Sequence, residues 1–160
     1  MTKPSAATIL ATPSNREIVL TRVVEAPRRL VFAAYTIPEH VARWMLGQEG
    51  WSMLVCEIDL RVGGAWHFIW RHADGSEMEM RGVYQEIVPP ERIVCTESWG
   101  GDWPETLNTL ILSEEGGKTT INQHVLYPSK QARDAALKTG MQEGASQSFD
   151  RLAEYLATMA

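Results

Sequence analysis

Large aromatic and sulfur-containing side chains alternate along two neighbouring segments, where they could form the wall of a binding site. Successive side chains of a β-strand point to opposite faces, so residues two apart share a face. The segments 65–71 and 77–88 carry these residues, which are Trp66, Phe68, Trp70, Met78, Met80 and Tyr84. Tryptophan offers a flat wall with one N–H donor, and methionine adapts to irregular partners. The pattern therefore predicts either a small-molecule pocket or a plain packed core.

Two polar residues fall on strand faces that are otherwise apolar. Glu97 lies on such a face of the segment 93–99, and Gln123 lies on the apolar face of 119–127. If Glu97 faces the interior, desolvation raises its pKa and makes it, with Tyr84, a candidate acid or base. The alternative for Glu97 is a solvated or salt-bridged side chain. Gln123 either bonds a neighbouring side chain or contacts a ligand, because burying it unpaired is costly.

The other reactive residue types have no spacing typical of a catalytic or metal centre. No pair of the four histidines has metal-ligand spacing, and no Gly-x-Ser-x-Gly elbow is present. We therefore expect no metal and no cofactor, and the only catalytic candidates are Glu97 and Tyr84. Cys56 and Cys95 lie inside apolar runs, as buried free thiols do. Together with the lack of an export signal at the N-terminus, they favour a cytoplasmic protein.

Composition narrows the classes of partner. The 160 residues fit one domain of ordinary size, with 44% hydrophobic and 22% charged residues. Fifteen basic residues against 20 acidic ones give a net charge of -5, which disfavours phosphate backbones and anionic lipid surfaces. No segment approaches the ~18 apolar residues of a membrane span. We therefore expect neither a nucleic acid partner nor membrane insertion.

Periodicity and turn signals predict the elements that must position these residues. Residues 1–14 are expected to form a flexible leader, and 15–160 a single domain. A strand over 17–25 is followed by two short helices that begin at Pro27 and Pro38, and then by six antiparallel strands. A long helix closes the chain. Antiparallel strands with helices packed on one side make an α+β fold.

The predicted last helix starts after Ser129, a plausible N-cap. Apolar residues recur along it every three or four positions, which marks a buried stripe. They are Leu137, Met141, Ala145, Phe149, Leu152 and Leu156. Gly140, Gly144 and Ser148 form a second stripe of small residues. Glycine weakens a helix by ~1 kcal/mol against alanine, so this stripe indicates a close neighbour or an open space.

Several short segments, taken together, resemble those of a known superfamily. They are Ala26-Pro27, Leu30 to Tyr35, Trp44 after Pro38-Glu39, Asp59 to Trp66, Asp74-Gly75, Gly82 to Tyr84, and Glu86 to Val94. The chain resembles the helix-grip START-like and Bet v-like (SRPBCC) superfamily. Within it, the chain is most similar to small bacterial members of the activator-of-heat-shock-protein-90-ATPase-like family. The resemblance covers about residues 16–157.

The resemblance implies a curved seven-stranded antiparallel sheet that grips the C-terminal helix, with a cavity between them. On this fold, inward-facing and rim residues become candidate ligand contacts. They are Trp44, Trp66, Phe68, Trp70, Met78, Met80, Tyr84, Trp99, Trp103, Gln123, Met141 and Phe149.

Three functions stay open on this basis. The first is binding of a hydrophobic or aromatic small molecule in the cavity. The second is an enzyme of the polyketide cyclase or hydrolase type that uses a cavity carboxylate such as Glu97. The third is a protein-interaction or stress-response module that acts as a homodimer through an exposed patch at Trp99 and Trp103.

Overall fold

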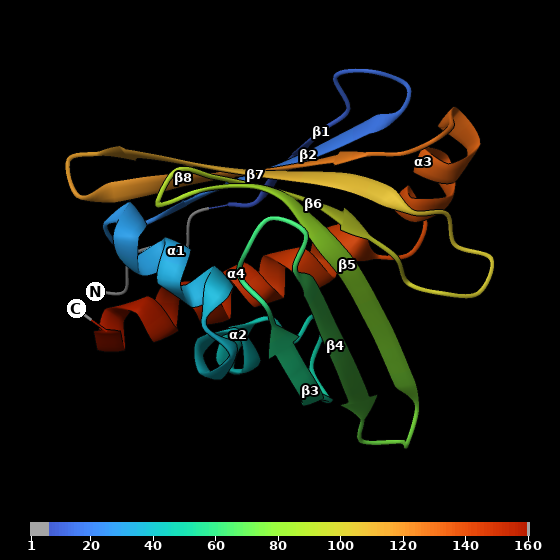
Figure 1. Ribbon diagram of the computed structural model, residues 1–160, viewed down its shortest axis with the longest axis horizontal. Helices are drawn as coiled ribbons and strands as arrows, with labels where there is room; N and C mark the ends of the chain where they lie inside the picture. The colour runs from blue at the N-terminus through green and yellow to red at the C-terminus, as the bar shows by residue number, and fades with distance from the viewer. Residues whose placement is uncertain (1–6, 160) are drawn as a thin grey trace.

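The protein is described here by a computed structural model that covers residues 7–159 (Figure 1). Its elements follow one another as β1 (Ile9–Ala11), β2 (Glu17–Val24), α1 (Arg28–Thr36), α2 (Pro38–Trp44), β3 (Trp51–Ile58), β4 (Ala65–His72), β5 (Glu77–Val88), β6 (Arg92–Glu97), β7 (Thr106–Glu115), β8 (Lys118–Leu126), α3 (Lys130–Leu137) and α4 (Met141–Met159).

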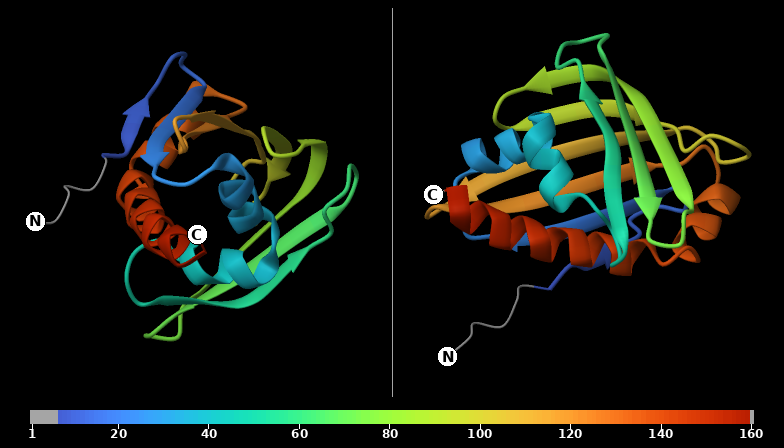
Figure 2. Two further views of the ribbon diagram at one scale, coloured as in Figure 1. Left: turned by 90° about the vertical axis from the view of Figure 1, so that its left-hand side faces the viewer. Right: turned by 90° about the horizontal axis from the view of Figure 1, so that it is seen from below.

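The strands form one antiparallel sheet in the order β1-β2-β8-β7-β6-β5-β4-β3. The sheet curves strongly, and α4 runs along its concave side (Figure 2). At one end α1 and α2 fill the space between sheet and α4, and both helices contact α4. The loop between β6 and β7 lies at the opposite end, to the right in Figure 1. This arrangement confirms the predicted α+β helix-grip fold.

The sheet has eight strands where seven were predicted. The extra strand is β1, which lies in the segment expected to be a flexible leader. Ile9–Ala11 pair antiparallel with residues 19–21 of β2. These three residues form a strand because the free edge of β2 supplies hydrogen-bond partners to a segment with little periodicity of its own. Residues 1–6 of the predicted leader lie outside the described residues.

The predicted long C-terminal helix is two helices, α3 and α4. Gly140 stands between them with φ 78°, a left-handed conformation that ends a helix and favours glycine. Ser129 caps α3 as expected, since its hydroxyl accepts a hydrogen bond from the Ala132 N–H at 3.1 Å. Leu137, expected in the buried stripe, is 37% exposed because it lies on α3, before the break. Phe149, Leu152 and Leu156 on α4 are buried as predicted.

The small-residue stripe accommodates a close neighbour. A Cβ on Gly144 would lie 3.9 Å from the backbone of Gly47 and from the side chain of Gln48. The Gly47 N–H donates to the Ser148 hydroxyl at 2.8 Å. The loop after α2 therefore rests directly on α4, and larger side chains on this stripe would displace it.

Candidate functional site

The predicted aromatic wall is a buried, tightly packed layer. Trp66, Phe68 and Trp70 are all buried, and successive rings lie 5.0 and 5.8 Å apart between centroids. The Trp70 indole N–H donates to the backbone oxygen of Met45 at 2.8 Å. Trp44 is buried behind this layer and donates to the backbone oxygen of Ala34 at 2.9 Å. These rings are held in place by core packing and by their own hydrogen bonds.

A polar row crosses the concave face beside this wall. Cys95 pairs with Asn108 and Glu97 pairs with Thr106 across β6 and β7, and Gln123 lies on the same face of β8. Four of these side chains keep part of their surface accessible: Cys95, Glu97, Asn108 and Gln123. Strands β6, β7 and β8 have neighbours on both edges. The accessible surface of these side chains therefore lies on the concave face of the sheet, toward α4.

Hydrogen bonds account for part of this polar row. The Tyr35 hydroxyl donates to Gln123 Oε1 at 3.2 Å, which matches the first of the two roles weighed for Gln123. The Asn108 amide donates to the Thr106 hydroxyl at 2.9 Å. Trp66 Nε1, by contrast, is buried with no hydrogen-bond partner. It lies beside the Cys95 thiol, whose sulfur is a weak acceptor, so the row meets the aromatic wall at a buried and weakly bonded indole N–H.

Glu97 is the chemically unusual member of the row. It is half-buried, and loss of hydration raises the pKa of its carboxyl group to about 7, although a hydrogen bond from Trp99 Nε1 at 2.8 Å opposes this rise. Its negative charge and burial together raise the pKa of Cys95 and of Tyr127 to about 12 each. A carboxyl group that titrates near neutral pH can accept or donate a proton, or pair with a cation.

Tyr127 lies near this carboxylate, Met141 lies beside Tyr127, and Tyr84 lies beside Cys95. Burial raises the pKa of Tyr84 above its ordinary value, so this side chain serves as a neutral hydrogen-bonding group. Tyr127 follows β8, and its hydroxyl lies 4.0 Å from the sulfur of half-buried Met141. Sequence reasoning missed Tyr127, although the alternation of Gln123 and Val125 extends to it and could have found it.

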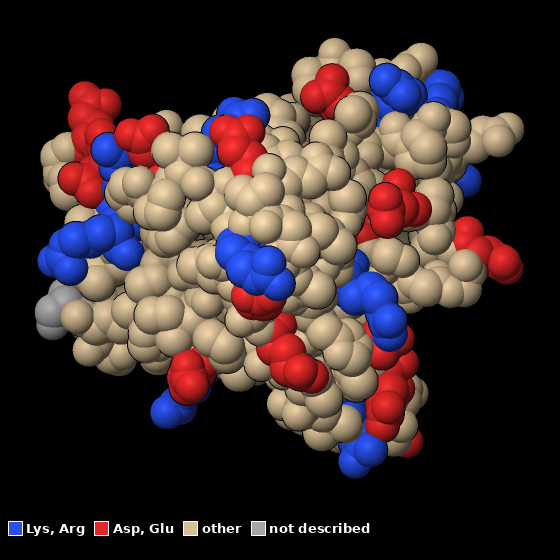
Figure 3. Space-filling view, viewed as in Figure 1, with Lys and Arg blue, Asp and Glu red and all other residues tan. Residues whose placement is uncertain are grey.

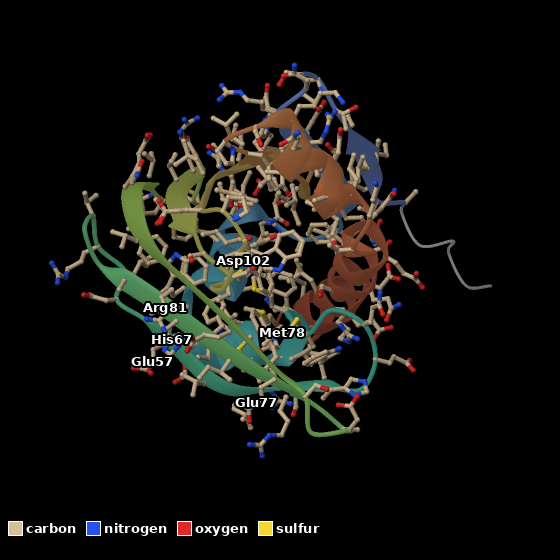
Figure 4. All side chains as sticks on the ribbon, turned by 90° about the vertical axis from the view of Figure 1, so that its right-hand side faces the viewer. Glu57, His67, Glu77, Met78, Arg81 and Asp102 are labelled. Atoms are coloured by element: carbon tan, nitrogen blue, oxygen red, sulfur yellow. The ribbon has the colours of Figure 1, made fainter. Side chains whose placement is uncertain are left out.

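The end of the molecule that carries the β6–β7 loop has accessible aromatic and sulfur-containing side chains. Trp99 stacks on Trp70 with centroids 5.7 Å apart and planes inclined by 19°, and it is 39% exposed. Trp103 is 47% exposed and Met78 is 40% exposed, whereas Met80 is buried. In Figure 4, Met78 and Asp102 appear over the opening of the ring formed by the sheet and the helices. Glu57, His67 and Glu77 lie on its outer side in the same view.

The structure therefore divides the predicted ligand contacts into two groups. One group belongs to the packed core: Trp44, Trp66, Phe68, Trp70, Met80, Tyr84 and Phe149. The other keeps accessible surface: Met78, Trp99, Trp103, Gln123 and Met141. Glu97, which is half-buried, belongs to neither group. A shallow surface hollow reaches Thr106 and Tyr127, at the same end of the sheet as Glu97. The aromatic wall lines neither this hollow nor a more polar one along α4.

Two kinds of feature are not found in the part of the chain that the structure describes. Within residues 7–159, no three His, Cys, Asp or Glu side chains gather as metal ligands would. No helix in that range combines the length and the apolar character needed to cross a bilayer.

Comparison with known proteins agrees with this architecture. The family described as Activator of Hsp90 ATPase homolog 1-like protein matches residues 25–157. A solved structure from Rhodobacter sphaeroides has 25% sequence identity and a TM-score of 0.88, and the match covers 96% of this chain and 99% of that chain. One from Chromobacterium violaceum has 28% identity and a TM-score of 0.74, over 87% of this chain and 96% of that chain.

A solution structure of an AHSA1-like protein from Aeromonas hydrophila shares the fold, with 18% identity, a TM-score of 0.70, and coverage of 89% of this chain and 95% of that chain. The curated proteins include no match. Because the family match spans most of the chain and the fold agrees with it, the chain belongs to the Activator of Hsp90 ATPase homolog 1-like family.

Proposed function

We propose that the chain binds a hydrophobic small molecule on the concave face of the sheet, between β6–β8 and α4, at the end where Trp99 stacks on Trp70. The observation that carries this proposal is the half-buried polar row beside the aromatic wall. A packed core seldom places a carboxyl group, a thiol and two side-chain amides together on one partly accessible surface. A mostly apolar surface with a few polar groups is typical of small-molecule sites.

Affinity in this site comes from burial of the ligand's apolar surface. Each 100 Å² of apolar surface removed from water contributes about 2.5 kcal/mol before the cost of association. Trp99 and Met78 supply exposed apolar surface that a ligand can cover without opening the core. A cytoplasmic location is part of the proposal, supported by the two free cysteines, Cys56 and Cys95.

Native mass spectrometry of freshly purified protein tests the proposal, with spectra taken before and after gentle unfolding. We expect a reproducible extra mass of small-molecule size that is lost on unfolding. Trp99→Ala should reduce the occupied fraction without unfolding the protein, because this side chain is 39% exposed. Leu54→Ala, at a 48% exposed position on β3, is the matched control and should leave occupancy unchanged. A dimer that covers Trp99 and Trp103, with no added mass, would favour the protein-interaction alternative.

A second candidate function rests on Glu97 alone. A carboxyl group whose pKa is about 7 is suited to general acid–base catalysis at neutral pH. Hydrolysis of 2-naphthyl acetate, followed from pH 5 to 9, tests this function. Catalysis should rise through pH 7 as Glu97 ionises and should be lost in Glu97→Gln. An identical rate in both proteins excludes Glu97 as the base for this substrate.

A further inference from the structure

Within the part of the chain that the structure describes, the negative charge on Glu97 has no positive partner. Its carboxylate forms no ion pair with any lysine, arginine or histidine among residues 7–159, and its one recorded hydrogen bond comes from Trp99. Acidic residues on the outer face differ. Glu79 pairs with His67 at 2.7 Å and with Arg81 at 2.8 Å. Acidic and basic groups accordingly alternate along that side of the molecule, at the lower right of Figure 3.

Aromatic side chains lie close to this carboxylate. Trp99 donates to it and stacks on Trp70, while Tyr127 is near enough for its pKa to be raised by the Glu97 charge and in turn contacts the sulfur of Met141. Aromatic faces attract cations through their quadrupole, most strongly in tryptophan and when the cation is desolvated. A carboxylate among such rings is a chemical environment for a hydrophobic cation.

The rim at this end has the same sign of charge. The loop 98–105 contains Trp99, Trp103, Asp102 and Glu105, and it has no lysine or arginine. Asp102 appears over the opening between sheet and helices when the molecule is viewed from this end in Figure 4. Like charges at the rim and in the interior repel an anionic ligand and attract a cationic one.

We propose that the molecule bound on the concave face is a hydrophobic cation, whose amine or quaternary ammonium group lies against Glu97 and Trp99 and whose apolar body extends toward the aromatic wall. This inference rests on the proposed function and adds the chemical class of the ligand.

Binding of such a cation depends on pH through Glu97. The titratable groups near it are Cys95 on its own strand and Tyr127 after β8, with Tyr84 on β5 beside Cys95, and all three stay neutral at pH 8 because their pKa values are raised. Thr106, its partner on β7, carries no charge. Among these groups only Glu97, with a pKa of about 7, changes charge between pH 5.5 and pH 8.

Isothermal titration calorimetry with three probes that share one aromatic body tests the inference. The cationic probe is (2-naphthylmethyl)trimethylammonium, the neutral probe is 2-naphthylmethanol, and the anionic probe is the carboxylate of 2-naphthaleneacetic acid. At pH 8 we expect the cation to bind at least ~10-fold more tightly than the alcohol, and the anion to bind more weakly than both. At pH 5.5 the preference for the cation should fall ~10-fold, because Glu97 is then protonated, while binding of the alcohol stays unchanged.

Glu97→Gln should abolish the cation preference at pH 8, so that the cation and the alcohol bind this variant within ~2-fold of one another. Glu115→Gln, which removes an equal charge at an exposed position at the far end of β7, should leave the preference intact. If the alcohol binds as tightly as the cation, or if Glu97→Gln keeps the preference, the cationic inference is overturned and the hydrophobic site remains. If none of the three probes binds and the native mass spectrum shows no extra mass, both the proposed binding function and the cationic inference fail.

Discussion

Replacement of Glu97 by glutamine should stabilise the protein, and by an amount that depends on pH. The folded state raises the pKa of this carboxyl group from 4.5 to about 7, chiefly by desolvation. At about 1.36 kcal/mol per pK unit, this shift corresponds to roughly 3 kcal/mol. Glutamine has nearly the same shape and can still accept the hydrogen bond from Trp99, but it carries no charge that burial would penalise.

The direction of this pH dependence follows from the linkage between folding and proton binding. Below pH 4.5 the carboxyl group is protonated in both the folded and the unfolded state and contributes no penalty. Between pH 4.5 and about 7 the folded state binds more protons than the unfolded state, so stability falls as pH rises. Above pH 7 the full penalty is present. The gain from Glu97→Gln should therefore be near zero at pH 4 and should approach about 3 kcal/mol at pH 8.

Urea unfolding at pH 4.5, 6 and 8, monitored by tryptophan fluorescence and circular dichroism, measures this difference. Glu115→Gln provides the control for a charge removed from an exposed position, and its effect should stay within about 0.5 kcal/mol at every pH. The reasoning is refuted if the difference between Glu97→Gln and the natural protein does not grow between pH 4.5 and pH 8. Such a result would mean that Glu97 is as well solvated in the folded state as in the unfolded chain.

Three further substitutions test the framework around the site by urea unfolding. Asp150→Ala should destabilise the protein by about 2 kcal/mol, since it leaves buried Arg22, its partner at 2.7 Å, without a counter-charge; equal stability of Asp150→Ala and the natural protein would contradict this role. Gly82→Ala should cost more than about 3 kcal/mol, because its Cβ would meet the backbone oxygen of Thr96, and a well-folded variant of normal stability would disprove that close approach. Ser129→Ala should cost about 1 kcal/mol through loss of the α3 cap, with Ser129→Asp restoring most of it.

Residues of the packed core contact and position residues of the candidate site. The aromatic wall is held by core packing and by the hydrogen bond from Trp70 to the loop after α2, and the same loop rests on α4 through Ser148. Trp99 is in turn positioned by stacking on Trp70. The rigid wall therefore holds in place an accessible aromatic ring and the carboxylate that it contacts, which reduces the ordering cost of binding a ligand.

The sequence alone determined the order of elements and the inward direction of the aromatic wall. Both depend on local periodicity: alternation places Trp66, Phe68 and Trp70 on one face wherever the strand lies in the sheet. Glycine turns after Asp74 and Glu115 mark the hairpins for the same reason, since a turn requires only a few neighbouring residues. The short segments that resemble the family also predicted the curved sheet and the C-terminal helix, which the structure confirms.

Tertiary structure decided which of these residues stay accessible. The surroundings of Glu97 include Tyr127 and, through Trp99, Trp70, which lie 27 or more positions away in sequence and approach it only through sheet register. The separate β1 strand depends likewise on the free edge of β2. Desolvation and nearby charges depend on which groups lie close in space, whatever their distance in sequence. The raised pKa of the Glu97 carboxyl group therefore arises only when the chain folds.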